Sequence, residues 1–130
     1  MTPAAQNHGQ HLIVSNNPCV WDRFASCVKI EGSALAVLSH ARDLIHLGRR
    51  LTGHPLAGSI RLLSNPFRSV LLGPLEPEAD CRSVRLIEES LARLSGVLPR
   101  PADSSGENDY QVIDLCLLES ALGVYPDKQA

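Results

Sequence analysis

Aromatic residues are scarce in this chain and make up only 4% of its 130 residues. Few aromatic rings leave few platforms on which nucleic-acid bases could stack. An excess of one charge is missing too, because 12 lysines and arginines stand against 14 aspartates and glutamates, for a formal net charge of −2. A nearly balanced charge lacks the electrostatic footprint of a nucleic-acid-binding protein. We therefore expect no nucleic-acid partner.

Long hydrophobic runs are also missing, and no uninterrupted apolar stretch approaches the ~18 residues that a membrane-spanning helix needs. Residues 1–10 show no basic segment followed by an apolar core, which a secretory signal would require. With 44% hydrophobic residues the chain is nevertheless too apolar to be disordered. We therefore expect one folded, cytoplasmic domain without a membrane partner.

Closely spaced cysteines are absent as well. The four cysteines lie at positions 19, 27, 81 and 116, whereas structural zinc sites usually present ligands roughly two to four residues apart. Without an export signal, a disulfide framework is not expected either. Cys116 lies in the apolar run 112–118 and is predicted to be a small core residue. We expect no metal and no cofactor.

Hydrophobic periodicity predicts a single domain at residues 11–123, between a flexible tail at 1–10 and a second tail at 124–130. The predicted strands are 11–15, 27–31 and 69–72, with an extended piece at 59–63, and the predicted helices are 18–24, 34–50, 78–94 and 110–122. A polar linker at 99–108 precedes the C-terminal helical segment 109–123. Alternation of strands and helices implies crossover connections. The expected fold is α/β, with a small, open, mostly parallel sheet of about three to four strands flanked by helices in a three-layer sandwich.

Polar residues collect at the carboxyl edge of the predicted sheet, where open α/β sheets usually bind ligands. Asn16 and Asn17 follow the first strand, and Gly32 and Ser33 follow the second. Free N–H groups at the start of the helix predicted at 34–50 could hold a small anion there. The simpler alternative is structural, with Ser33 as a helix N-cap and an Asx-type turn at the two asparagines.

A second group of candidates lies on the polar face of the helix predicted at 34–50, where Arg42, Asp43 and His46 are neighbours. A histidine beside a carboxylate and an arginine could transfer protons or hold an anionic substrate. The alternative is a solvated face with ordinary ion pairs, each worth under ~1 kcal/mol.

His54 and Ser59 lie in the long connection 52–68, where no helical or strand pattern requires them. Loop residues carry binding chemistry more often than patterned residues do. Ser33 and His46 are 13 residues apart, or ~20 Å along a helix. The two groups of candidates therefore form one site only if the connection returns toward Ser33.

Nucleophile signatures are weak. Glycines do not flank Ser59 as they would in a G-x-S-x-G elbow, and a cysteine hydrolase would rest on Cys19 alone. The sequence by itself does not decide whether the chain is an enzyme.

Several short motifs resemble the GrdX family in order and spacing, across about residues 11–123. They are IVSNNP at 13–18, EGS at 31–33, ARDLIH-x-G at 41–48, HPLAGS at 54–59, NPFRS at 65–69 and DYQVIDL at 109–115. Members of that family are encoded beside the glycine, sarcosine and betaine reductase systems of amino-acid-fermenting bacteria. The resemblance implies a cytosolic accessory role and transfers no catalytic residue to this chain.

Two hypotheses of different classes follow. In the first, a non-catalytic accessory protein binds a reductase component through an exposed apolar or charged patch. In the second, a small enzyme or small-anion-binding protein uses Arg42, His46 and His54 around one cleft. The C-terminal helix is nearly all apolar at 112–118 and is expected either to be buried or to form a homodimer.

Overall fold

The computed structural model describes residues 11–56, 65–97 and 107–123. The two predicted tails, the extended piece at 59–63 and most of the polar linker lie outside these residues. The described elements are β1 (Leu12–Ser15), α2 (Pro18–Arg23), β2 (Cys27–Lys29), α3 (Ala34–His46), β3 (Arg49–Leu51), β4 (Ser69–Leu75), α4 (Cys81–Ser95) and α5 (Glu107–Leu122).

The four strands form one mixed sheet in the order β2-β1-β4-β3. β1 and β2 are parallel, whereas β4 runs antiparallel to both β1 and β3. The prediction of a mostly parallel sheet is therefore wrong, although the α/β class is confirmed. The helix α2 lies between β1 and β2 and provides the crossover that a parallel pair needs. No helix is described between β3 and β4, and these two strands pair antiparallel.

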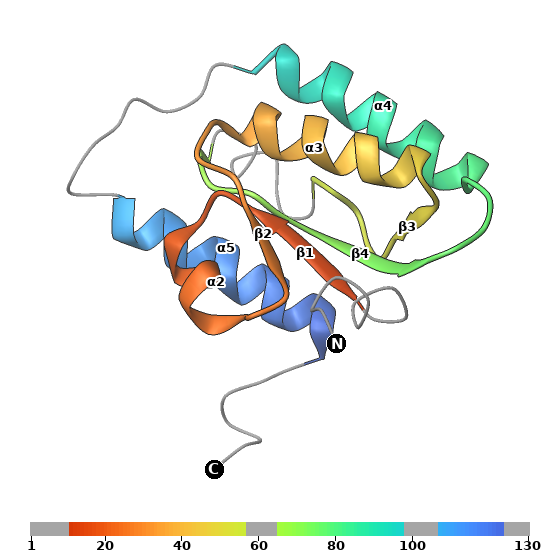
Figure 1. Cartoon of the computed structure of the whole chain (residues 1–130). Coiled ribbons are helices and arrows are strands. Elements are labelled where there is room, and N and C mark those ends of the chain that lie inside the picture. The colour runs from red at the N-terminus through yellow and green to blue at the C-terminus, as the bar shows by residue number, and fades with distance from the viewer. Residues whose placement is uncertain (1–10, 57–64, 98–106, 124–130) are drawn as a thin grey trace.

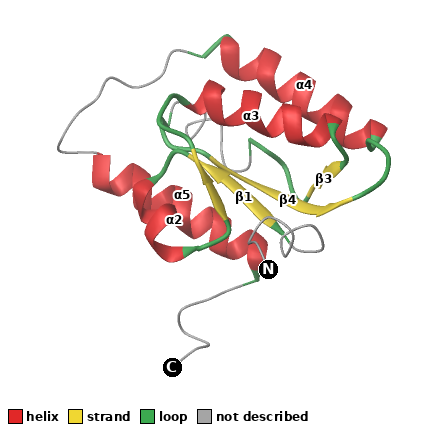
Figure 2. Cartoon of the chain, viewed as in Figure 1, coloured by secondary structure: helices red, strands yellow, loops and turns green. Residues whose placement is uncertain are grey.

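Helices cover both faces of the sheet, with α3 and α4 on one side and α2 and α5 on the other (Figure 1, Figure 2). The alternation of side chains along the strands produces these two layers of core. Val14, Val70 and Leu72 pack with α3 and α4, while Ile13 and Leu71 pack with α2 and α5. The chain thus builds a three-layer α/β sandwich.

The helix α3 ends at His46, four residues before its predicted end. Gly48 has a φ of +125°, a conformation that glycine adopts without a steric penalty, and its carbonyl accepts a hydrogen bond from Glu76 N at 3.0 Å. Arg49 then enters β3, where its guanidinium is buried and donates to Gly73 O at 3.1 Å. The prediction that Arg49 lies in the last helical turn is wrong because Gly48 turns the chain into a strand.

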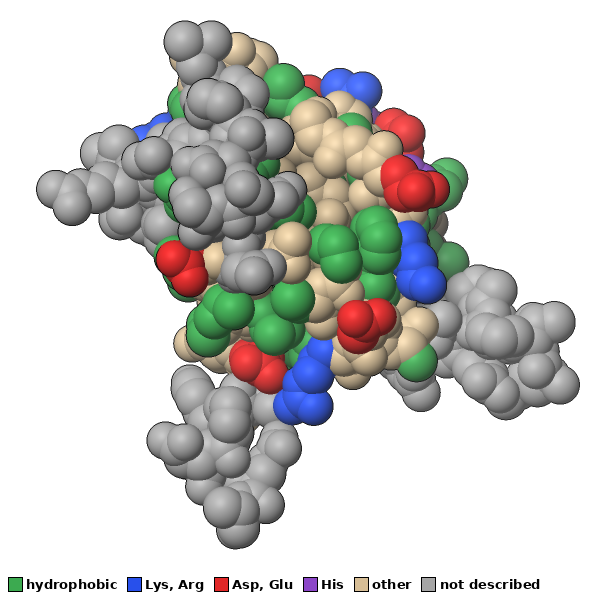
Figure 3. All heavy atoms as spheres, turned by 90° about the vertical axis from the view of Figure 1, so that its left-hand side faces the viewer, with side chains coloured by type: hydrophobic (Ala, Val, Ile, Leu, Met, Phe, Trp, Pro, Cys, Tyr) green, Lys and Arg blue, Asp and Glu red, His purple; other side chains and the backbone are tan. Residues whose placement is uncertain are grey.

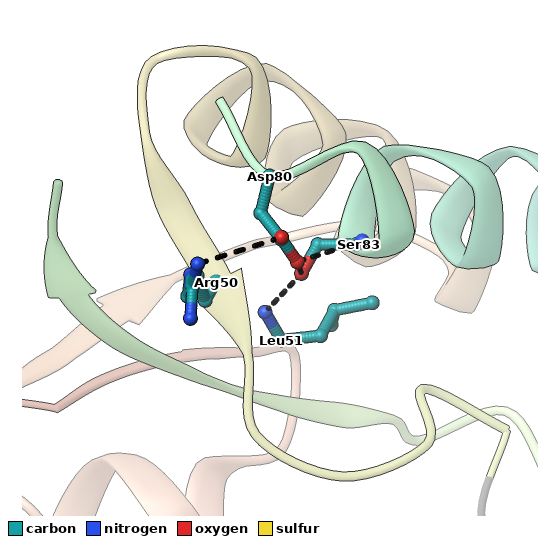
Figure 4. A network of polar contacts seen from close by, with 4 residues as sticks. All are labelled: Arg50, Leu51, Asp80 and Ser83. Atoms are coloured by element: carbon teal, nitrogen blue, oxygen red, sulfur yellow. Dashed lines mark hydrogen bonds and ion pairs between the residues drawn. The ribbon is translucent and has the colours of Figure 1, made fainter. Parts of the chain in front are cut away.

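The edge strand β3 is tied to the start of α4 by polar contacts (Figure 4). Leu51 N donates to Ser83 Oγ at 3.0 Å, and Ser83 Oγ donates to Asp80 Oδ2 at 2.7 Å. Asp80 is the N-cap of α4, because Oδ2 also accepts from Ser83 N at 3.0 Å. Its other oxygen lies 3.6 Å from Arg50 Nη2. These contacts occupy a backbone N–H that an edge strand would otherwise leave unpaired.

Replacing Asp80 with alanine is expected to lower the melting temperature at pH 7 and to lower it less at pH 3. The hydrogen bonds from Ser83 lower the pKa of Asp80 below 3.8, so the ionised carboxylate stabilises the fold above that pH, and the contribution is lost as the pH falls through the lowered pKa. Thermal unfolding followed by circular dichroism at the two pH values measures the effect. Glu78→Ala, an exposed neighbour, is the control, and an equal loss in both variants would contradict the capping role.

The helix α5 buries one face and exposes the other. Cys116 is exposed, which corrects its prediction as a core residue, whereas Asp114 and Leu118 are each 4% exposed. Val112 is 52% exposed. The run 112–118 is apolar nearly all round, so its periodicity could not select the buried face, and the position of Asp114 shows that polar contacts select it.

The cysteines are expected to react with iodoacetamide at very different rates. Cys81 and Cys116 are exposed, whereas burial raises the pKa of Cys27 from 9.0 to about 11. A thiol at the higher pKa holds about 100-fold less reactive thiolate at pH 8. Mass spectrometry of the alkylated peptides should therefore show Cys27 modified last, and modification as fast as that of Cys81 would contradict its burial.

None of the described helices is long and apolar enough to span a bilayer. On the face shown in Figure 3, acidic and basic side chains lie among small groups of hydrophobic ones. Neither sign of charge dominates that face.

Candidate functional site

Asn16 joins three segments at the carboxyl edge of β1 and β2. Its Nδ2 donates to Gly32 O and Pro66 O, both at 2.9 Å, and its Oδ1 accepts from Arg68 N at 2.8 Å. The side chain is only 7% exposed. The structure therefore confirms that Asn16 and Gly32 meet at one sheet edge, and the amide of Asn16 is used to hold that edge together.

Asn17 is fully buried and connects β1 with α5. Its Oδ1 caps α2 by accepting from Cys19 N at 3.0 Å. Its Nδ2 donates to Gln111 O at 2.8 Å and to Asp114 Oδ2 at 3.0 Å. Asn17 thus supplies one of the polar contacts that select the buried face of α5.

Ser33 behaves as the structural alternative predicts. It is the N-cap of α3, with Oγ accepting from Ala36 N at 3.2 Å, and the residue is exposed. This bond gives a partner to one of the backbone N–H groups in the first turn, which have none within the helix.

Arg42 and His46 face α4 rather than a cleft. Both lie near Glu88, with Arg42 Nη1 3.9 Å and His46 Nε2 3.5 Å from its carboxylate. Asp43 lies 4.0 Å from Arg42 Nε and its side chain is 75% exposed. These pairs match the alternative of a solvated face with ordinary ion pairs, each worth under ~1 kcal/mol.

His54 lies in a different environment, at the start of the connection that follows β3. Its Nδ1 accepts from Leu56 N at 3.0 Å, so the neutral imidazole carries its proton on Nε2. His54 lines a cavity whose described wall includes neither Arg42 nor His46. The structure therefore does not bring the three side chains of the second hypothesis together. Ser59 lies outside the described residues.

This cavity has a volume of about 120 Å³ and lies between β4, the residues after β3 and the helix α5. Five of its lining side chains carry polar groups, namely Thr52, His54, Arg68, Ser69 and Asp114. Apolar side chains of α5 and β4 complete it, among them Leu71, Leu117 and Leu118. A concave site with a few convergent polar groups is typical of small-ligand binding.

A chain of hydrogen bonds leads from β1 to the cavity. Asn17 N donates to Ser15 Oγ at 3.0 Å, the hydroxyls of Ser15 and Ser69 lie 2.7 Å apart, and Ser69 Oγ donates to Asp114 Oδ2 at 2.6 Å. Because Ser69 gives its only proton to Asp114, Ser15 must donate to Ser69. Each bond polarises the next toward the Asp114 carboxylate.

Arg68 and Asp114 bring opposite charges to the same cavity, and each is only 4% exposed. Burial raises the pKa of Asp114, an effect opposed by its hydrogen bonds from Ser69 and Asn17 and by the charge of Arg68. Burial likewise lowers the pKa of Arg68, and the charge of Asp114 opposes that shift. Each charge thus reduces the cost of burying the other.

This arrangement suits binding better than nucleophilic catalysis. A serine activated by a catalytic triad donates to an imidazole, which in turn contacts the carboxylate. Here Ser69 donates directly to Asp114, so His54 does not stand between them. Among residues 11–56, 65–97 and 107–123, no group of three or more His, Cys, Asp or Glu side chains could hold a metal ion.

Sequence reasoning missed the residues that line this cavity, apart from His54. One signal was available for Asp114, a carboxylate inside an apolar run that is otherwise typical of a buried helix. Arg68 and Ser69 carry no comparable signal in the local pattern, and the only pointer to them was their place in the NPFRS motif at 65–69.

Comparison with protein families identifies the chain. The family model described as GrdX-like protein matches residues 12–123, which covers every described element of the fold. Comparisons with curated proteins and with solved structures found no match. The extent of the family match shows that the chain belongs to the GrdX-like protein family.

Proposed function

We propose that this protein is a cytoplasmic accessory protein of glycine, sarcosine or betaine reductase systems and that it acts by binding a protein component of such a reductase. Membership of the GrdX-like family supports the association with these systems. The observation that carries the binding role is an exposed pair of leucines at one corner of the fold.

The leucine corner consists of Leu47, which is 69% exposed, and Leu75, which is 38% exposed. Leu47 follows α3 and Leu75 ends β4, next to the hydrogen bond between Gly48 and Glu76. Covering apolar surface gains about 25 cal/mol per Å². A partner that covers this corner would also meet the charged groups of α3 and α4, which would form a polar rim around an apolar centre.

Co-elution on size-exclusion chromatography with purified reductase components tests the proposal. The wild-type chain is expected to co-elute with one component. Leu47→Asp is expected to weaken the complex at least tenfold, because it introduces a charge into the apolar contact, and ~1.4 kcal/mol of lost binding is enough for that.

Val112→Asp is the matched control, since Val112 is 52% exposed on α5, which covers the opposite face of the sheet. This variant is expected to bind like the wild type. Co-elution with no component, or equal weakening by both substitutions, would overturn the proposed role of the leucine corner.

Binding of a small molecule is a second candidate function. It is favoured by the cavity that Arg68, Ser69, Asp114 and His54 line. Arg42 and His46, which the sequence suggested as partners of His54, are not among the described lining residues. The two functions are compatible, because the cavity and the leucine corner are built from different residues.

The homodimer through the C-terminal helix stays a prediction. Val112 and Cys116 are two exposed side chains of α5 that a second copy could cover. Light scattering on the eluted protein measures its mass, and a monomer at every concentration would contradict this prediction.

A further inference from the structure

We propose that the cavity between β4 and α5 binds a small zwitterion, a molecule of about five or six non-hydrogen atoms that carries one ammonium and one carboxylate, such as the smallest α-amino acids. The inference rests on the second candidate function, small-molecule binding, and is independent of the leucine corner.

The charges of the cavity select for a zwitterion. Arg68 and Asp114 line the same small space and each is 4% exposed. A guanidinium binds a carboxylate through two parallel hydrogen bonds, and a carboxylate accepts from an ammonium. A ligand with a single charge is attracted by one of these groups and repelled by the other, whereas a zwitterion gains from both.

The Asp114 carboxylate has room to accept the ammonium. The hydrogen bonds that it receives from described side chains, from Ser69 and from Asn17, both end on Oδ2. The backbone N–H of Ser69 donates to the same carboxylate. Because a carboxylate offers about four acceptor positions, one remains for a ligand while the others hold the group in place. The Ser15–Ser69 chain holds the acceptor in place before the ligand arrives, which reduces the ordering cost of binding.

The size of the cavity sets the size of the ligand. A volume of about 120 Å³ equals that of roughly four water molecules in the liquid, and an engineered cavity of about 150 Å³ in another protein binds benzene, with its six carbons. The apolar side chains of Leu71, Leu117 and Leu118 close the wall. A ligand with a long side chain would therefore exceed this space.

Isothermal titration calorimetry with glycine, acetate and methylammonium, at one ionic strength, tests the charge argument. Glycine is the smallest α-amino acid, and the other two compounds each carry one of its charges. Glycine is expected to bind at least tenfold more tightly than either. If acetate binds as well as glycine, the cavity is a plain anion site and the zwitterion is excluded; if none of the three binds, small-molecule binding fails as well.

Two substitutions locate the binding. Ala121→Leu adds bulk to a residue that lines the cavity and is exposed at its mouth, so it is expected to weaken glycine binding at least tenfold without changing the melting temperature. Ser120→Leu, the exposed neighbour outside the described lining, is the matched control and should bind normally. Unchanged binding in Ala121→Leu would show that glycine binds elsewhere.

Asp114→Asn tests the ammonium contact directly. It removes the negative charge and keeps the shape, so the preference for glycine over acetate is expected to fall at least tenfold. An unchanged preference would overturn the assignment of the ammonium to Asp114. If this variant does not fold, the Ala121→Leu and Ser120→Leu pair still decides whether the cavity is the site, and co-elution with a reductase component tests the proposed accessory role separately.

Discussion

Replacing Asp114 with alanine is expected to lower the free energy of unfolding by about 3–5 kcal/mol, the usual cost of removing one partner from a buried charged network. The substitution removes the acceptor of hydrogen bonds from Ser69 and Asn17. It also leaves Arg68, only 4% exposed, without the carboxylate that offsets the cost of its burial. The side-chain bond from β4 to α5 is lost at the same time, whereas Asn17 still donates to Gln111 O.

Urea unfolding followed by circular dichroism measures this effect. Asp109→Ala is the matched control, because Asp109 is an exposed carboxylate on the same helix, and surface changes of this kind usually stay within about 0.5 kcal/mol. A loss below about 1 kcal/mol in Asp114→Ala would mean that the buried network does not hold α5 on the sheet.

Replacing Gly48 with alanine is expected to cost more than about 4 kcal/mol, because two penalties combine at this position. The φ of +125° is one that side-chain-bearing residues rarely adopt. A Cβ at this position would in addition collide with the carbonyl oxygen of Glu76. Relief of that collision would separate the end of β4 from the turn between α3 and β3.

Gly53→Ala isolates the first of these penalties. Gly53 has a φ of +104°, and a Cβ there would meet no other atom within 4 Å, so this variant is expected to lose only about 1–3 kcal/mol. Parallel thermal and urea unfolding of the two variants gives the difference. Equal losses would show that the backbone around Gly48 relaxes and that its close contact with Glu76 is not required.

The layered α/β architecture could be predicted from local patterns. The apolar positions of α3 and α4 recur with helical period, and Ser33 marks the first turn of α3, as capping chemistry requires. The sequence also predicts that Asn16 and Gly32 lie at one edge of the sheet, because each follows a strand of a parallel pair. The hydrogen bond of 2.9 Å between them confirms this prediction.

The direction of β4 and the existence of β3 could not be predicted in this way. β3 is only three residues long, and its first residue, Arg49, is a buried cation that a strand pattern would not suggest. The antiparallel pairing of β4 depends on how the connection after β3 runs, and the sequence carries no local signal for that path. Tertiary pairing, rather than propensity, decides both features.

The cavity could not be predicted because its polar groups come from distant segments. Ser69 and Asp114 are 45 residues apart and share a hydrogen bond of 2.6 Å. No spacing rule links such positions, in contrast to the neighbours Arg42 and His46, whose helical spacing suggested a site that the structure shows as surface ion pairs with Glu88.

The central claim, that the protein acts by binding a reductase component, is tested most directly by isothermal titration calorimetry with each purified component at several temperatures. The account predicts saturable binding to one component with a negative heat-capacity change, since a partner would bury Leu47 and Leu75. Leu47→Asp should weaken that binding and make the heat-capacity change smaller. Absence of binding to every component by the folded protein, or binding that Leu47→Asp leaves unchanged, would contradict the account.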